Sequence, residues 1–146
     1  MRLPRLIFLL FNADRAVRRW IDARSSDTGI GASGAGVLFY LAGHENALIG
    51  DVTAALGASP SGMSGLVNRL ERGGYVTRSP DPADARAVRL ALTPRGHQAV
   101  ARARDLVDEL NVQLTAGFDD AEIAVIQRWL EHVTRVSINR ESGADR

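Results

Sequence analysis

Apolar residues recur every three or four positions through most of the chain, and this spacing predicts a mainly helical protein. The first helix is expected over residues 3–23, where Leu3, Ile7 and Leu10 begin an apolar face. A loop rich in Ser and Gly follows over residues 25–34. So much apolar surface on a terminal helix needs a partner, either the body of the same subunit or a second subunit.

The apolar run at residues 36–44 fits either a buried strand or a short helix, since periodicity does not separate the two at this length. We favour a helix, because a second helix is needed behind the central unit to complete its core. Residues 47–49 are expected to form a brief strand. Residues 51–56 are expected to form the next helix, with Asp51 in its first turn, where a carboxylate suits the helix dipole.

A second central helix is expected to begin at Pro60, where a missing N–H costs nothing, with Ser59 as its cap. Apolar residues then recur at helical spacing and predict a buried stripe made of Met63, Leu66, Val67 and Leu70. The helix is expected to end at Gly73-Gly74, because glycine readily takes the left-handed conformation past the last turn.

A β-hairpin is expected next. The runs Tyr75–Arg78 and Val88–Leu92 have strand character and flank a turn-rich tip over Ser79–Ala87. Two short helices joined by a turn containing Gly57, followed by a two-stranded ribbon, form the layout of a winged helix-turn-helix. This layout predicts a DNA-binding regulator.

The C-terminal third predicts two further helices. Thr93-Pro94 starts the first of them, and Gly117 breaks its apolar stripe. Asp119 and Glu122 resemble a capping box for the last helix. That helix has two apolar faces, which implies contact with more than one neighbour, and a polar, frayed tail is expected from Ser137 onward.

Composition and charge narrow the functional classes. The 146 residues fit one domain, and the absence of cysteine excludes disulfides and cysteine-ligated metals. The net charge of +1 conceals a pattern, since residues 58–96 carry six Arg and three acids (+3) and residues 97–146 carry six Arg and nine acids (−3). A basic central segment is typical of a nucleic-acid binder. The apolar run at residues 6–11 is too short for an export signal or a membrane span, so a cytoplasmic protein without membrane contact is expected.

Four stretches together resemble a known family. Asp81-Pro82-Ala83-Asp84-Ala85-Arg86 and Leu92-Thr93-Pro94-Arg95-Gly96 are similar to the wing signature of the MarR family (multiple antibiotic resistance regulators), and Leu56–Ser61 and Leu66–Gly73 resemble its helix-turn-helix. The resemblance covers nearly the whole chain, because the flanking helices match the family layout in order and length. It implies a mainly α fold with a small β-wing and a homodimer with interlocking N- and C-terminal helices. Two winged motifs would then face successive major grooves of pseudo-palindromic double-stranded DNA.

Within a single MarR-type domain (1–146), the resemblance implies dimerisation helices at 1–32 and 97–140, a DNA-binding unit at 33–96 and a frayed tail at 141–146. Many members of the family are repressors released by small, often aromatic, ligands. Such an effector would bind between the dimer helices and the DNA-binding unit. Aromatic residues there either line the effector pocket or belong to the core, and they are Trp20, Phe39 and Tyr40.

The outward face of the central helix is expected to contact DNA, and it carries Ser61, Ser64, Gly65, Asn68, Arg69 and Arg72. Asn68 is the outward side chain able to pair bidentately with adenine, the alternative being a solvated surface residue. Arg69 and Arg72 are expected to contact phosphates. Gly62 and Gly65 depart from the family pattern, in which side chains are more usual, so direct base readout is expected to be sparse.

In the wing, Arg86 is the strongest candidate, because a long planar cation suits the narrow minor groove. Asp84 is expected to pair with an Arg and hold the wing in shape, and Asp81 either does likewise or caps the turn. Arg78 and Arg89 flank the ribbon and are supporting candidates for phosphate contacts.

Little in the sequence favours catalysis. His44, His97 and His132 lack a metal-like spacing, and neither a nucleophile–base pair nor a phosphate loop stands out, so no enzyme activity, cofactor or metal is expected. Two functions remain. The first is a homodimeric repressor of a nearby operon that binds DNA and responds to a small molecule. The alternative is a winged-helix protein-interaction module with weak or lost DNA binding, which the two glycines of the central helix favour.

Overall fold

The computed structural model describes residues 5–141, and side chains over residues 5–136. It divides into two compact units, residues 1–104 and 105–146. The first unit contains α1 (Leu6–Arg24), α2 (Gly31–Gly43), β1 (Ala47–Leu48), α3 (Ile49–Ala55), α4 (Pro60–Arg72), β2 (Val76–Pro80), β3 (Val88–Leu92) and the beginning of α5 (Pro94–Thr115). The second contains the rest of α5 and α6 (Asp120–Glu141).

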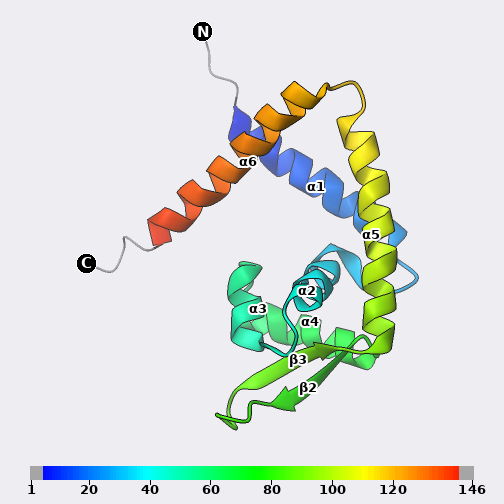
Figure 1. Cartoon of the computed structure of the whole chain (residues 1–146), viewed down its shortest axis with the longest axis vertical. Coiled ribbons are helices and arrows are strands. Elements are labelled where there is room, and N and C mark those ends of the chain that lie inside the picture. Colours follow the sequence, from blue (N-terminus) through cyan, green and yellow to red (C-terminus); the bar gives the residue numbers. More distant parts are fainter. Residues whose placement is uncertain (1–4, 142–146) are drawn as a thin grey trace. The chain divides into compact units, whose positions relative to one another are not determined.

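The three strands form one antiparallel sheet with the order β1-β3-β2. Figure 1 shows β2 and β3 as the two arms of the hairpin. Ala47 pairs with Leu90, and Thr77 pairs with Ala91. The brief strand expected at residues 47–49 is therefore confirmed at its first two residues, and it joins the β2–β3 hairpin into a three-stranded wing.

The core of the first unit lies between α2, α3, α4 and the sheet. Its largest fully buried side chains are Leu38, Met63, Leu90, Val37, Val52, Val67 and Val76. The predicted stripe of α4 is confirmed, since all four of its apolar residues are buried. Each buried side chain of this size contributes about 1.5–3 kcal/mol relative to an exposed one, so this cluster fixes α4 against the sheet.

The segment at residues 36–44, which fitted either a strand or a helix, lies in a helix, α2. The loop predicted over residues 25–34 is shorter than expected, because this helix already begins at Gly31. The helix begins at Gly31, because the carboxylate of Asp22 on α1 accepts the Ala32 N–H at 2.8 Å and caps it. Gly34 is buried, and a Cβ there would lie 3.4 Å from Leu70 of α4 and 2.9 Å from the Ile30 side chain. Glycine here lets α2 approach α4 closely, a packing reason that local sequence rules do not contain.

The hairpin tip was also predicted too long. Ser79 and Pro80 belong to β2, and Pro80 pairs with Val88. Proline is tolerated there because β2 is an edge strand, where a missing N–H breaks no ladder. The tip therefore begins at Asp81.

The second unit begins within α5. Gly117 has a φ of +90° between α5 and α6, as expected of the residue that breaks the helix. The predicted capping box is confirmed, since Asp119 Oδ1 accepts the Glu122 N–H and Glu122 Oε2 accepts the Asp119 N–H, each at 2.9 Å. The tail expected from Ser137 was wrong in part, because α6 continues to Glu141. The remaining tail and the expected helix start at Leu3 lie outside the described residues.

Candidate nucleic-acid interface

The helix α4 is held firmly at both ends. Ser59 Oγ accepts the Gly62 N–H at 3.1 Å, with Pro60 in the first turn, as the sequence predicts. At the other end Gly74 takes a φ of +76°, and the Tyr75 N–H donates to the Leu70 carbonyl at 2.9 Å. Its outward face is exposed at every predicted position, namely Ser61, Ser64, Gly65, Asn68, Arg69 and Arg72.

A side chain from the hairpin reaches this face. Arg78 on β2 donates from Nη2 to Oδ1 of Asn68, and its Nε lies 3.2 Å from Oε2 of Glu71 as an ion pair without the alignment of a hydrogen bond. The Arg78 guanidinium is therefore engaged within the protein. The sequence predicted a phosphate contact for Arg78 and missed its pairing with Glu71, because that contact joins residues seven apart on two different elements, α4 and β2.

The base of the wing tip is organised by one buried carboxylate. Asp81 accepts the Ala83 N–H at 2.6 Å and the Asp84 N–H at 3.2 Å, and its Oδ2 accepts from Arg89 Nε at 2.6 Å. Its pKa lies below the ordinary value of 3.8 because the Ala83 N–H stabilises the charged form, an effect that burial opposes and that the Arg89 hydrogen bond and charge reinforce. Asp81 thus both caps the turn and pairs with an Arg.

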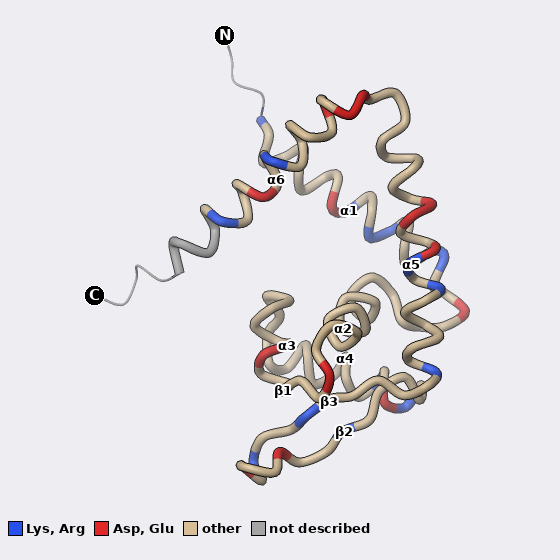
Figure 2. Tube along the Cα trace, viewed as in Figure 1, with Lys and Arg blue, Asp and Glu red and all other residues tan. Residues whose placement is uncertain are grey.

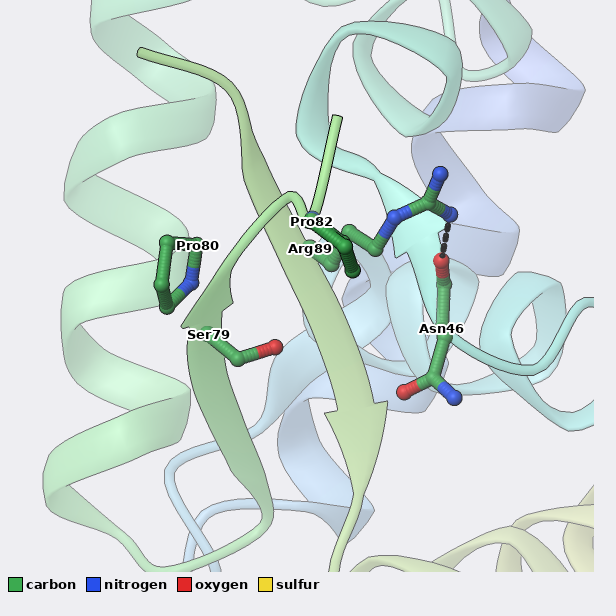
Figure 3. Close-up of a pocket in the computed structure, with 5 residues that line it drawn as sticks. All are labelled: Asn46, Ser79, Pro80, Pro82 and Arg89. Atoms are coloured by element: carbon green, nitrogen blue, oxygen red, sulfur yellow. Dashed lines mark hydrogen bonds between the residues drawn. The ribbon is translucent and has the colours of Figure 1, made fainter. Parts of the chain in front are cut away.

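Arg89 also ties the wing to the turn before β1. Its Nη1 donates to the backbone oxygen of Asn46 at 2.6 Å (Figure 3). Asn46 is the described non-glycine residue with a positive φ, +53°, a conformation that asparagine tolerates better than most residues. An open depression of about 390 Å³ lies beside this contact and is lined by Asn46, Ser79, Pro80, Pro82 and Arg89. The sequence reasoning missed this depression, and two of the Arg89 donors expected to reach phosphate are used internally.

The structure corrects the role expected of Asp84. Its Oδ1 accepts the backbone N–H of Arg86 at 2.9 Å, while the arginine partner in the wing belongs to Asp81. The reason is position, since Asp81 stands where β2 ends and the tip begins, whereas Asp84 lies within the tip, two residues before Arg86. Arg86 is exposed, and its guanidinium has no hydrogen bond or ion pair with the described part of the chain. Figure 2 shows the charged positions at the far end of the hairpin.

The hairpin, α4 and α5 meet at Thr93. Its hydroxyl donates to the Gly74 carbonyl at 2.6 Å and accepts the Gly96 N–H at 3.0 Å, and its own N–H donates to the Tyr75 carbonyl at 3.1 Å. The predicted cap of α5 is thereby confirmed, and it also joins the end of α4 to the beginning of β2. These bonds fix the hairpin relative to the exposed face of α4.

The aromatic residues expected to line an effector pocket have other neighbours in the structure. Arg24 lies over the Trp20 ring at 3.7 Å from its centroid, and Tyr40 stacks on His44 with centroids 4.2 Å apart. Phe39 and Tyr40 pack against the core cluster. No ring contact joins Trp20 to Phe39 or Tyr40 within the described residues, so an effector site there stays a prediction. Over the same residues, no group of three His, Asp or Glu side chains could hold a metal, and no helix is long and apolar enough to cross a membrane.

Curated relatives share part of the chain. It is 29% identical over 82 residues to YsmB of Bacillus subtilis, an uncharacterised HTH-type transcriptional regulator, with 56% of each protein covered. It is 27% identical over 97 residues to the HTH-type transcriptional repressor IacR of Pseudomonas putida, covering 66% of this chain and 58% of IacR. The matches thus span about half the length of these relatives.

Solved structures match over nearly the whole chain. A MarR protein from Peptoclostridium difficile has a TM-score of 0.89 at 16% identity, covering 96% of this chain and 94% of the other. A mutant of Escherichia coli MarR, complexed with operator DNA, has a TM-score of 0.80 at 24% identity, covering 88% and 92%. At these identities the likeness shows the fold. Residues 28–87 also match the model of the MarR family. That match covers the helix-turn-helix and most of the hairpin, and the chain has the winged fold of solved MarR structures.

Proposed function

We propose that this protein binds double-stranded DNA as a sequence-specific regulator, through the exposed face of α4 and the tip of the wing. The observation that carries the proposal is the free guanidinium of Arg86 on a tip braced by Asp81, beside a capped helix whose outward face is polar. The solved structure of Escherichia coli MarR with operator DNA supports it, since its fold is shared.

In this proposal each exposed residue has a part. Arg86 enters the minor groove, where it responds to groove width more than to base identity. Arg69 and Arg72 contact phosphates, and the two serines of α4, Ser61 and Ser64, contact phosphates or bases. Gly65 brings the helix backbone close to the groove, while Asp84 orders the tip through the Arg86 N–H.

The protein is proposed to act as a homodimer, because each compact unit exposes large apolar side chains on its terminal helix. In α1 these are Leu6, Ile7, Phe8, Leu9 and Phe11, exposed by 43–59%. In α6 they are Val125, Ile126, Leu130 and Val136, exposed by 42–53%. A second copy of the chain would cover such surfaces, and a dimer could place two winged motifs about 34 Å apart, one turn of DNA.

We further propose that the regulator is a repressor of a nearby operon, as the name of IacR indicates for that relative. A small, aromatic ligand near Trp20, Phe39 and Tyr40 would favour a spacing of the two motifs that does not fit DNA. Such a ligand acts only by its differential affinity for the two arrangements, and this gives release by population shift.

The test is a fluorescence anisotropy titration with the promoter DNA next to the protein's own gene, over a series of salt concentrations. The wild-type affinity should fall steeply with salt, and Arg86→Ala should weaken binding and reduce the magnitude of the logarithmic salt slope by about 1. Arg135→Ala, an exposed arginine on α6, is the matched control and should leave the slope unchanged. If the wild type shows no binding at low salt, the protein-interaction alternative replaces this proposal.

A further inference from the structure

The contact between Arg78 and Asn68 fixes the chemical group that Asn68 offers to a ligand. An arginine side chain has donors and no acceptor, so the amide atom that faces the Arg78 Nη2 is the oxygen. The orientation of the amide therefore follows from chemistry. The amide nitrogen, with two N–H donors, is the polar group left over, and it makes no hydrogen bond within the described residues.

The charge of Arg78 is compensated in place. Its Nε lies 3.2 Å from Oε2 of Glu71, one turn along α4 from Asn68, and the Arg78 side chain is 29% exposed. A guanidinium that pairs with a carboxylate neutralises little phosphate charge. Arg78 is thus suited to hold a neighbour and poorly suited to anchor the DNA backbone.

We infer that Arg78 is a positioning residue that makes Asn68 a hydrogen-bond donor in the major groove, so that Asn68 selects guanine over adenine. Guanine presents two acceptors there, N7 and O6, which suit the amide N–H donors. Bidentate pairing with adenine needs the amide oxygen to accept from N6. That would bring the N6 donor beside a guanidinium that presents only donors. The inference rests on the proposed DNA binding and replaces the adenine contact expected from the sequence.

The experiment is selection of bound duplexes from a library with a random central segment, with sequencing of the enriched pool. The wild type should enrich guanine at one position in each half-site. Asn68→Ala and Asn68→Asp should each lose that enrichment by roughly tenfold, since neither retains the N–H donors. Asn111→Ala, a change in an exposed asparagine of α5, is the matched control and should leave the selection unchanged.

The double variant Arg78→Met/Glu71→Gln separates positioning from charge, because it leaves the net charge unaltered. Freed from Arg78, the Asn68 amide can rotate and pair bidentately, so the enriched base should change from guanine to adenine. The salt slope should stay at its wild-type value, whereas it falls in Arg86→Ala. Glu71→Gln alone should keep guanine. An enriched duplex with 7-deazaguanine at the selected position should bind the wild type less tightly than the unmodified duplex does.

Enrichment of adenine by the wild type, or an unchanged selection in Asn68→Ala, overturns the inference while leaving DNA binding intact. Failure of the wild type to retain any duplex at low salt overturns the proposed function, and this inference falls with it.

Discussion

The carbonyl oxygen of Tyr75 occupies the place where a Cβ on Gly96 would have to lie. A methyl group at position 96 would clash with this oxygen. The oxygen belongs to the main chain, so it can be displaced only by moving the backbone. The first turn of α5 can therefore rest on the start of the hairpin only while position 96 is glycine. The same backbone oxygen accepts the Thr93 N–H, so a displacement here would disturb the junction of α4, β2 and α5.

Gly96→Ala should accordingly destabilise the protein, by about 1–3 kcal/mol in the free energy of unfolding, as overpacking commonly does. Urea denaturation followed by circular dichroism measures the change. Gly43→Ala near the end of α2, where a Cβ meets nothing within 4 Å, is the control. Equal stability of the two variants would contradict this account of the junction.

The two glycines of α4 should respond differently to alanine. A Cβ on Gly65 meets nothing within 4 Å, whereas one on Gly62 lies 2.9 Å from the Ser59 hydroxyl that caps the helix. Gly65→Ala should raise the unfolding free energy by about 0.5–1 kcal/mol through helix propensity. Gly62→Ala should gain less, or lose, because the cap must shift. Thermal unfolding of both variants in parallel tests the contrast, and equal gains would argue against it.

The contribution of Asp81 to stability should depend on pH. Its pKa is lower in the folded protein than the ordinary 3.8, because the Ala83 N–H and Arg89 favour the carboxylate. Its stabilisation is therefore present above the unfolded-state pKa and is lost as the pH falls through the folded-state pKa. Asp81→Asn should be less stable than the wild type near neutral pH, and the difference should shrink below about pH 3.8. Denaturant titrations of both proteins at several pH values measure the gap, and a gap independent of pH would be inconsistent with the mechanism.

Charges placed on the exposed apolar faces should disrupt the proposed homodimer. Phe8 on α1 is 59% exposed and Ile126 on α6 is 42% exposed, so neither is needed for the core of its own unit. Phe8→Asp/Ile126→Asp should shift the protein from dimer to monomer in size-exclusion chromatography with light scattering. Ser26→Asp, at an exposed position after α1, should remain dimeric. A wild-type protein that is monomeric throughout the concentration range would refute the proposal directly.

Local patterns were sufficient for most elements of the fold. Ser59, Gly74 and the Asp119–Glu122 box act as caps or breaks where the sequence predicts, because capping depends on residues a few positions apart. Contacts between distant segments were harder to anticipate. The cap that Asp22 supplies to α2 and the hold of Arg78 on Asn68 each span ten residues of sequence.

The same limit applies to the candidate interface. The outward face of α4 follows from helical periodicity and could be predicted from the sequence. The contacts of Arg78 and Arg89 within the protein could not be predicted in this way. An arginine near a ribbon looks the same in sequence whether its partner is a phosphate or a carboxylate. The partner of Arg89 is Asp81, eight residues earlier along the hairpin, and only strand pairing brings the two together.

Arg89 holds Asp81 with one nitrogen and the Asn46 carbonyl with another, and both bonds are 2.6 Å long. The Arg89 side chain thus bridges the tip of the hairpin and the turn that follows α2. Tilting the wing away from that turn would break a hydrogen bond to a charged donor, so we expect a displacement of α2 to shift the tip as well. Through Arg89, the turn after α2 is therefore connected to the tip that carries Arg86.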